Sequence, residues 1–170
     1  MSTSDTDLGS PRRVHVVGAG GAGMAAIASV LRSMGHGVTG SDLRDSAVTE
    51  RLRAEGVPVT IGHDAANIGA AELLAVSTAI PERNPEVRAA RDAGVPVLRR
   101  GDILPAISAE RRTIVVAGTH GKTTTSSMLA LVLVEANLHP SFIIGGDVNE
   151  IGSGAVWDDG EWFVIEGDES

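Results

Sequence analysis

The sequence contains no cysteine, which excludes disulfide bonds, thiolate metal sites and a cysteine nucleophile. Aromatic residues make up only 2% of the chain, and its two tryptophans and two phenylalanines are expected to serve packing. No apolar run approaches the roughly 20 residues that a membrane-spanning helix needs. The first ten residues lack the basic start and apolar core of a secretory signal. We therefore expect a cytoplasmic protein with no membrane partner.

Positive charge is scarce and scattered. The chain has 14 Lys and Arg against 22 Asp and Glu, a net charge of −8, and its basic residues occur singly or in pairs. Nucleic-acid binding depends on clustered cations that displace counterions, so no nucleic-acid partner is expected. A phosphate group can still be bound locally, because N–H groups at a helix start attract anions whatever the net charge.

The length and patterning indicate two α/β domains, the second incomplete. A chain of 170 residues can hold one complete domain and the start of another. From residue 13, short β-branched runs alternate with helical stretches, as in βα units around a parallel sheet. We predict a disordered tail at 1–12, a Rossmann-like parallel-sheet domain at 13–109 and the beginning of a P-loop-type domain at 110–170. Because a parallel sheet needs several βα units, we expect the chain to end inside that second domain.

The element boundaries follow from periodicity and from glycine and proline positions. The predicted strands cover residues 14–17, 38–41, 57–61, 73–77, 95–98, 113–117, 142–144 and 162–165. The predicted helices cover residues 22–34, 48–55, 85–93, 102–107 and 123–135. The segment 145–160, rich in glycine and aspartate, is predicted to be a loop.

Residues 18–23 form a first glycine-rich loop that fits G-x-G-x-x-G between a predicted strand and a predicted helix. Without side chains, the backbone lets a diphosphate approach the unpaired N–H groups of the helix start. The alternative is that the glycines only permit a tight turn and close helix packing. Asp42 lies 19 positions after Gly23, where an acidic residue commonly binds a ribose hydroxyl, so the local pattern indicates NAD. The alternative is that Asp42 serves only as a turn residue or as the N-cap of the next helix.

Residues 118–124, Gly-Thr-His-Gly-Lys-Thr-Thr, form a second glycine-rich loop that also follows a predicted strand and opens a helix. The common triphosphate-binding pattern would place glycine at position 116, where this chain has Val116. Lys122 can nevertheless reach the β and γ oxygens of ATP, and the Thr123 hydroxyl can ligate Mg²⁺. A lysine merely solvated at a helix start would oppose the helix dipole. The loop therefore predicts ATP binding with Mg²⁺.

An acidic cluster, Glu166-Gly167-Asp168-Glu169, follows the last predicted strand. The carboxyl end of a strand is the ligand side of an open α/β sheet, and Mg²⁺ prefers hard oxygen ligands. Glu166 is therefore a candidate metal ligand, with an exposed acidic loop as the alternative. The five histidines lack metal-ligand spacing, and only His120, inside the second loop, is singled out as a residue near substrate.

Seven segments, taken together and in order, resemble the Mur ligases. They are Gly20-Gly21-Ala22-Gly23-Met24, Gly40-Ser41-Asp42, Ile61-Gly62-His63, Ser77-Thr78-Ala79-Ile80, Asn84-Pro85-Glu86-Val87, Gly118 to Thr124, and Glu166 to Ser170. The resemblance covers nearly the whole chain from residue 13. Two positions depart from the family pattern: Gly167 stands where Ala or Cys is commoner, and Thr78 replaces Ser, which keeps the hydroxyl.

The resemblance implies an ATP-dependent, amide-forming ligase of peptidoglycan precursor synthesis. Its substrates would be UDP-N-acetylmuramate, ATP and L-alanine, its cofactor Mg²⁺, and its intermediate an acyl phosphate that the amino group attacks. The first domain would bind the UDP part of the substrate instead of NAD, the central domain ATP, and a third domain the amino acid. This chain alone would then be inactive.

By the same resemblance, the site residues form three groups. The UDP-substrate group is Gly20, Gly21, Ala22, Gly23, Ser41, Asp42, His63, Ser77 and Thr78; the ATP group is Gly118, Thr119, His120, Gly121, Lys122, Thr123 and Thr124; the metal group is Thr123 and Glu166. Lys122 would stabilise the transferring phosphate, and His120 would lie close to the muramate carboxylate. A related ligase that recycles murein tripeptide shares the second loop but differs in the first. It remains an alternative, as do an NAD-binding module and a nucleotide-sensing domain without phosphate transfer.

Overall fold

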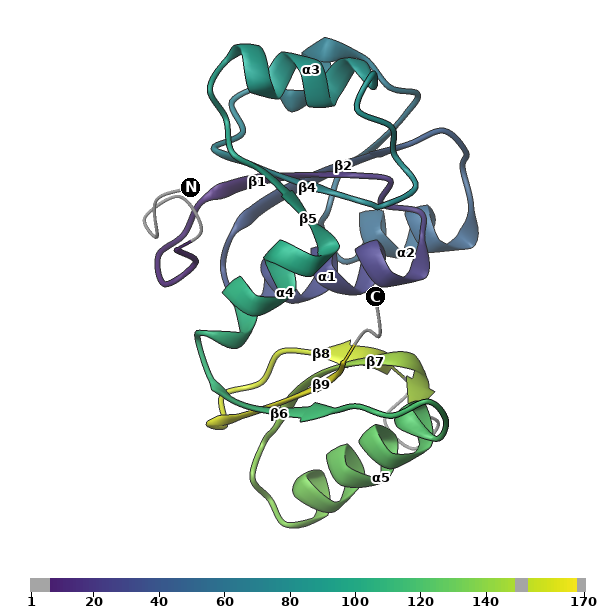
Figure 1. Ribbon diagram of the computed structural model, residues 1–170, viewed down its shortest axis with the longest axis vertical. Helices are drawn as coiled ribbons and strands as arrows, with labels where there is room; N and C mark the ends of the chain where they lie inside the picture. Colours follow the sequence, from purple (N-terminus) through teal and green to yellow (C-terminus); the bar gives the residue numbers. More distant parts are fainter. Residues whose placement is uncertain (1–6, 149–152, 168–170) are drawn as a thin grey trace. The chain divides into compact units, whose positions relative to one another are not determined.

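The structure, a computed structural model, describes residues 7–148 and 153–167. The chain divides into two compact units, Met1–Ile107 and Ser108–Ser170. Each unit is built around its own β-sheet, with strand order β3-β2-β1-β4-β5 in the first and β6-β9-β7-β8 in the second (Figure 1). Within the described ranges, no helix combines the length and the apolar character needed to cross a lipid bilayer.

The five strands of the first unit are all parallel. They are β1 (Arg13–Val17), β2 (Gly37–Asp42), β3 (Val59–Ile61), β4 (Leu73–Val76) and β5 (Val97–Arg99). A parallel sheet covered on both faces needs nearly continuous apolar strands, and every residue of β4 is buried. The predicted Rossmann-like parallel sheet is therefore confirmed.

Helices cover both faces of this sheet. They are α1 (Ala22–Ser33), α2 (Ala47–Ala54), α3 (Pro85–Asp92) and α4 (Arg100–Ser108), with a 3₁₀ helix η2 (Ala65–Ile68). Helix α3 and η2 pack together on one face, and α1 and α2 on the other (Figure 1). Under α3, Val87 and Ala90 pack against Val17, Leu74 and Val76 of the sheet. The carboxyl ends of the strands thus lie between two layers of helices.

Helix α3 begins with a buried side-chain cap. The Oδ1 atom of Asn84, a residue that is 5% exposed, accepts hydrogen bonds from the N–H groups of Glu86 at 2.9 Å and Val87 at 3.3 Å. Pro85 occupies the first helical turn, where its missing N–H costs nothing. The cap therefore fixes the start of the helix at Pro85 and places the buried residue Glu86 in its first turn.

We expect Asn84→Ala to lower the free energy of unfolding by about 1 to 2 kcal/mol, because two buried N–H groups lose their acceptor. Urea denaturation of the 170-residue chain measures the loss. Asn84→Asp keeps an acceptor oxygen and should retain most of the stability. An unchanged urea midpoint for the alanine variant would contradict the role of the cap.

The second unit is a four-stranded sheet with one long helix on it. Its strands are β6 (Arg112–Val116), β7 (Ser141–Val148), β8 (Ser153–Val156) and β9 (Trp162–Glu166), and its helix is α5 (Lys122–Glu135). Strands β6, β9 and β7 are parallel, and β8 is antiparallel to β7. Ala130 of α5 packs against Phe142, Ile144 and Val164 of the sheet.

The predicted loop at residues 145–160 is wrong in part. Strand β7 continues to Val148, and Ser153–Val156 form β8, which pairs with it. The glycines in this segment carry little strand propensity of their own, so the pairing of Phe142 with Val156 and of Ile143 with Ala155 decides its conformation. Tertiary pairing here overrides the local composition.

Candidate functional site

The first glycine loop joins β1 to α1 and is tied to the end of β2. The N–H groups of Gly18 and Ala19 both donate to the carbonyl oxygen of Ser41, at 2.9 and 3.0 Å. Next to it, Oδ2 of Asp42 accepts the N–H of Gly20 at 2.8 Å. The backbone of Gly18 is left-handed, with φ +81°, a conformation that favours glycine. Asp42 thus holds the loop through Oδ2, while its Oδ1 accepts the N–H of Arg44 at 3.1 Å, which is the turn role given as the alternative.

The start of α1 has unpaired N–H groups. Gly21 is its N-cap and supplies no side-chain cap, and no hydrogen bond to the Ala22 or Gly23 N–H occurs within the described part of the chain. A Cβ atom on Gly23 would lie 2.1 Å from Nη1 of Arg100, so this guanidinium lies against the helix start. The helix dipole and the arginine together make this point strongly attractive to an anion. Arg100 could not be predicted as a site residue, because it lies 77 positions after Gly23 and belongs to no motif with it.

The turn after β4 borders the same loop. A Cβ atom on Gly18 would lie 3.0 Å from Cβ of Ser77, and Arg99 fixes the turn by donating to the carbonyl oxygens of Ser77 at 3.0 Å and Ile80 at 2.9 Å. Thr78 lies in this turn with its side chain exposed. Ser77 is therefore adjacent to the glycine loop, as expected for a site residue.

A buried polar cluster lies beneath α3. The Glu86 carboxylate accepts hydrogen bonds from Ser41 Oγ at 2.6 Å and Asn67 Nδ2 at 2.5 Å, and lies 3.1 Å from Nδ1 of His63. Nε2 of His15 is 3.9 Å away. Burial raises the pKa of Glu86, but the nearby imidazole of His15 and the hydrogen bonds from Ser41 and Asn67 outweigh it and lower the pKa from 4.5 to about 2. Two predicted site residues, Ser41 and His63, thus share one ionised carboxylate.

Sequence reasoning assigned no role to Glu86, Asn67 or His15. The only signal for Glu86 was its place in the segment Asn84-Pro85-Glu86-Val87, which belongs to the family pattern. The partners come from four separate segments of the chain, so no local motif could have grouped them.

The second glycine loop joins β6 to α5. Gly118 and Gly121 both have left-handed backbones, with φ +151° and +76°, and Gly121 is the N-cap of α5 without a side-chain cap. Nζ of Lys122 donates to the carbonyl oxygen of Gly118 at 2.6 Å, so the ammonium folds back over the loop. Five of the seven residues predicted for this site are exposed: Thr119, His120, Gly121, Thr123 and Thr124.

Glu166 ends β9 beside this loop. It pairs in parallel register with Val116, the last residue of β6. Its Oε1 atom accepts hydrogen bonds from Ser126 Oγ and from the N–H of Gly145, both at 3.1 Å. Ser126 is one helical turn after Thr123, so the structure brings the two predicted metal ligands to the same end of α5. Asp168 and Glu169 lie outside the described residues.

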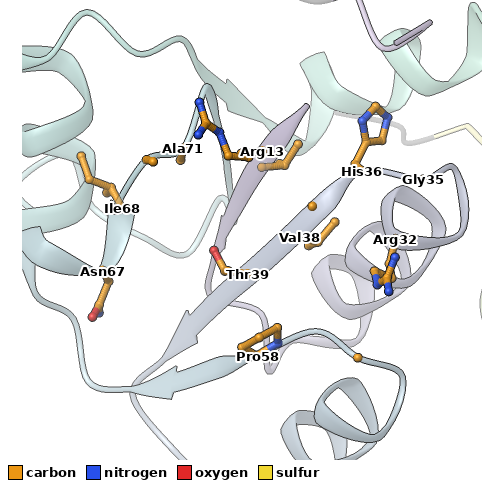
Figure 2. Close-up of a pocket in the computed structure, with 15 residues that line it drawn as sticks. Arg13, Arg32, Gly35, His36, Val38, Thr39, Pro58, Asn67, Ile68 and Ala71 are labelled. Carbon is orange, nitrogen blue, oxygen red and sulfur yellow. The ribbon is translucent and has the colours of Figure 1, made fainter. Parts of the chain in front are cut away.

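A cavity of about 500 Å³ lies at the opposite edge of the first sheet, where β1 and β2 begin (Figure 2). Its basic lining residues have structural roles, because Arg13 pairs with Glu72 at 3.2 Å and Arg32 lies in the last turn of α1, where a cation complements the helix dipole. None of the predicted site residues lines it. We therefore assign no ligand to this cavity.

Comparison with known sequences gives consistent matches. A family model described as "Mur ligase family, catalytic domain" matches residues 13–112. UDP-N-acetylmuramate–L-alanine ligase of Acidiphilium cryptum is 50% identical over 157 residues, which cover 92% of this chain and 33% of that protein. The protein of the same name from Rubrobacter xylanophilus is 51% identical over 158 residues, 93% of this chain and 35% of that protein. The chain thus spans about a third of the length of the curated relatives it matches.

Solved structures give matches of the same kind. The UDP-N-acetylmuramate-alanine ligase of Thermotoga maritima superposes with a TM-score of 0.82 at 31% identity, covering 91% of this chain and 37% of that one. The UDP-N-acetylmuramate:L-alanyl-γ-D-glutamyl-meso-diaminopimelate ligase of Neisseria meningitides superposes with a TM-score of 0.84 at 32% identity, covering 94% of this chain and 53% of that one.

Proposed function

The chain belongs to the Mur ligase family, and on this premise we propose that it carries the UDP-binding domain and part of the ATP-binding domain of a ligase that joins L-alanine to UDP-N-acetylmuramate. The observation that carries the proposal is the pair of helix starts without side-chain caps, Gly21 before α1 and Gly121 before α5, each following a strand of its sheet. Relatives of this name are about 50% identical over more than nine tenths of the chain, which supports the choice of substrate. ATP is abundant in the cytosol, and we place the reaction there.

In the first unit, the diphosphate of the substrate would lie at the start of α1. The unpaired N–H groups of Ala22 and Gly23 would donate to its oxygens, and Gly20, Gly21 and the Ser77 turn would border it. Ser41, Asp42, His63 and Thr78 complete the proposed nucleotide-sugar site. The same loop with Asp42 would suit NAD, but Asp42 Oδ2 already accepts the N–H of Gly20, so it is less available to a ribose hydroxyl.

In the second unit, residues 118–124 would surround the phosphates of ATP. The donor set at this end of α5, the Thr123 hydroxyl and the Glu166 carboxylate, suits Mg²⁺, which takes one or two carboxylates together with phosphate oxygens and water. When bound, Mg²⁺ would neutralise charge on the β- and γ-phosphates. Lys122 would leave the Gly118 carbonyl to contact the transferring phosphoryl group, and His120, exposed in the loop, would lie near the muramate carboxylate.

The reaction balances as carboxylate, amine and ATP giving amide, ADP and phosphate. A muramate carboxylate oxygen attacks the γ-phosphorus, and the bond from that phosphorus to the ADP oxygen breaks. The L-alanine nitrogen then attacks the acyl carbon, loses a proton, and displaces phosphate. The protein's part is to position the reactants and stabilise the transferring charge.

The direct test of the first site is calorimetric titration of the 170-residue chain with UDP-N-acetylmuramate. We expect saturable heat, competition by UDP, and no displacement by NADH. A folded chain that gives no heat at millimolar ligand, or that binds NADH without competition from UDP, would refute the substrate assignment in favour of the dinucleotide-binding alternative.

The tripeptide-recycling ligase is the second candidate, favoured by the Neisseria structure described above. An enzyme of the relatives' full length separates the two by phosphate release. We expect release with L-alanine as the amine substrate and far less with L-alanyl-γ-D-glutamyl-meso-diaminopimelate. The reverse preference would select the second candidate, and release with neither would leave a nucleotide-binding domain without ligase activity.

A further inference from the structure

Glu86 is a fully buried carboxylate for which the proposed reaction has no use. Removing a charge from water is costly, and it persists inside a protein only when hydrogen bonds or opposite charge compensate it. Here the compensation comes from donors, Ser41 O–H at 2.6 Å and Asn67 N–H at 2.5 Å, and from its position in the first turn of α3. The carboxylate is therefore held in place as an acceptor.

This arrangement decides where His63 carries its proton. Nδ1 of His63 lies 3.1 Å from Oε2 of Glu86 and 3.3 Å from Oγ of Ser41. The carboxylate has only lone pairs to offer, and the Ser41 proton is already directed to it, so both neighbours require Nδ1 to be the donor. In a neutral imidazole with its proton on Nδ1, Nε2 is an acceptor.

Nε2 of His63 is buried and has no hydrogen-bond partner among the residues that the structure describes. Leaving a buried acceptor unsatisfied is unfavourable, so this nitrogen is suited to receive a donor that arrives with a ligand. The ring is next to Ser41, whose carbonyl oxygen holds the N–H groups of Gly18 and Ala19 in the glycine loop. Ser41 thus links the His63 ring to the glycine loop of the proposed nucleotide site.

We propose that Glu86 is a positioning residue for nucleotide binding: it keeps His63 in the Nδ1–H tautomer, so that Nε2 accepts a hydrogen bond from a donor of the nucleoside. That donor is a ribose hydroxyl or the imide N–H of uracil, which present the same chemistry to the nitrogen. The inference rests on the proposed function of the first unit and adds to it a residue that need not touch the substrate.

The test is ¹⁵N NMR of the histidine side chains in the 170-residue chain, with the His63 signals assigned by their loss in His63→Gln. In the wild type we expect the pattern of the Nδ1–H tautomer and an upfield shift of Nε2 when UDP is added. A wild-type His63 protonated on Nε2, or an Nε2 that does not respond to bound UDP, would overturn the proposal without requiring any variant of Glu86 to fold.

Glu86→Gln supplies the second arm. Asn67 still needs an acceptor, so the new amide oxygen faces it and the amide NH₂ faces His63, whose Nδ1 must then accept while Nε2 takes the proton. We expect the tautomer to switch and UDP affinity to fall about tenfold or more, whereas Glu50→Gln, an exposed change of the same kind on α2, alters neither. A folded Glu86→Gln chain that binds UDP as tightly as the wild type contradicts the proposal.

Two further probes identify the donor. Tighter binding of UDP than of 3-methyl-UDP, with the difference lost in Glu86→Gln, indicates the imide N–H, and the same pattern with 2′- or 3′-deoxy-UDP indicates a ribose hydroxyl. Equal binding of all these probes by the wild type overturns the inference. Failure of the proposed function is distinguishable, because the wild type would then not bind UDP at all.

Discussion

Lys122→Ala is expected to lower ligase turnover by about 1,000-fold or more in an enzyme of the relatives' full length, while the affinity for UDP-N-acetylmuramate stays within about twofold of the wild type. The ammonium is the only side-chain cation in residues 118–124 apart from a protonated His120, and it lies at the start of α5 beside the proposed phosphate positions. Negative charge develops on the leaving ADP and on the transferring phosphoryl group during the reaction. In the alanine variant this charge would lack the lysine ammonium as its stabilising partner. The UDP site belongs to the other unit, so its affinity should be unaffected.

Single-turnover phosphate release measures the loss, and calorimetry measures UDP-substrate affinity on the same sample. Lys122→Arg is the matched variant: it retains the charge but replaces a compact ammonium by a planar guanidinium, and we expect it to recover only a small part of the rate. Normal turnover in the alanine variant would remove Lys122 from the mechanism. A large loss of UDP-substrate affinity would instead indicate that the whole chain had been disturbed.

Gly21→Ala is expected to weaken UDP binding by about 100-fold, or about 3 kcal/mol, without unfolding the chain. Gly21 has φ −76° and ψ 137°, which alanine adopts readily, and a Cβ atom there would meet only the Gly18 carbonyl oxygen at 3.6 Å. The methyl group would, however, occupy the approach to the unpaired N–H groups of Ala22 and Gly23, where the diphosphate is proposed to lie.

Gly37→Ala is the matched control, since Gly37 lies at the opposite end of β2 and its added Cβ would make only ordinary contacts, at 3.7 Å or more. It should leave UDP affinity unchanged. Thermal denaturation shows whether each variant folds. A folded Gly21→Ala chain with wild-type affinity would place the diphosphate elsewhere.

The resemblance to the Mur ligases is confirmed, and the sequence was most informative where function is concentrated in contiguous residues. Each glycine loop is a run of adjacent residues, rich in glycine, between a strand and a helix. The loops that begin at Gly18 and Gly118 could therefore be identified from their local sequence. The parallel sheet was predictable for a similar reason, because its strands are short apolar runs separated by helices. The site roles of individual residues remain predictions.

Contacts between distant segments were not predictable. The pairing of β8 with β7 depends on a neighbouring strand and not on the glycine-rich residues themselves, so the segment 145–160 looked like a loop. Glu86 joins residues 15, 41, 63 and 67, which meet only after α3 and η2 have packed on the sheet. Arg100 approaches Gly23 only because β5 and β1 end at the same edge, and a single sequence carries no trace of that distance.

The contact between the Lys122 ammonium and the Gly118 carbonyl has a kinetic consequence. In the proposed ATP complex, the ammonium would exchange this carbonyl oxygen for a phosphate oxygen by rotation about its four-carbon stem. Side-chain rotation of this kind takes place within nanoseconds, far faster than a loop can refold. Release of the lysine from the Gly118 carbonyl should therefore not be the slow step in the proposed binding of ATP.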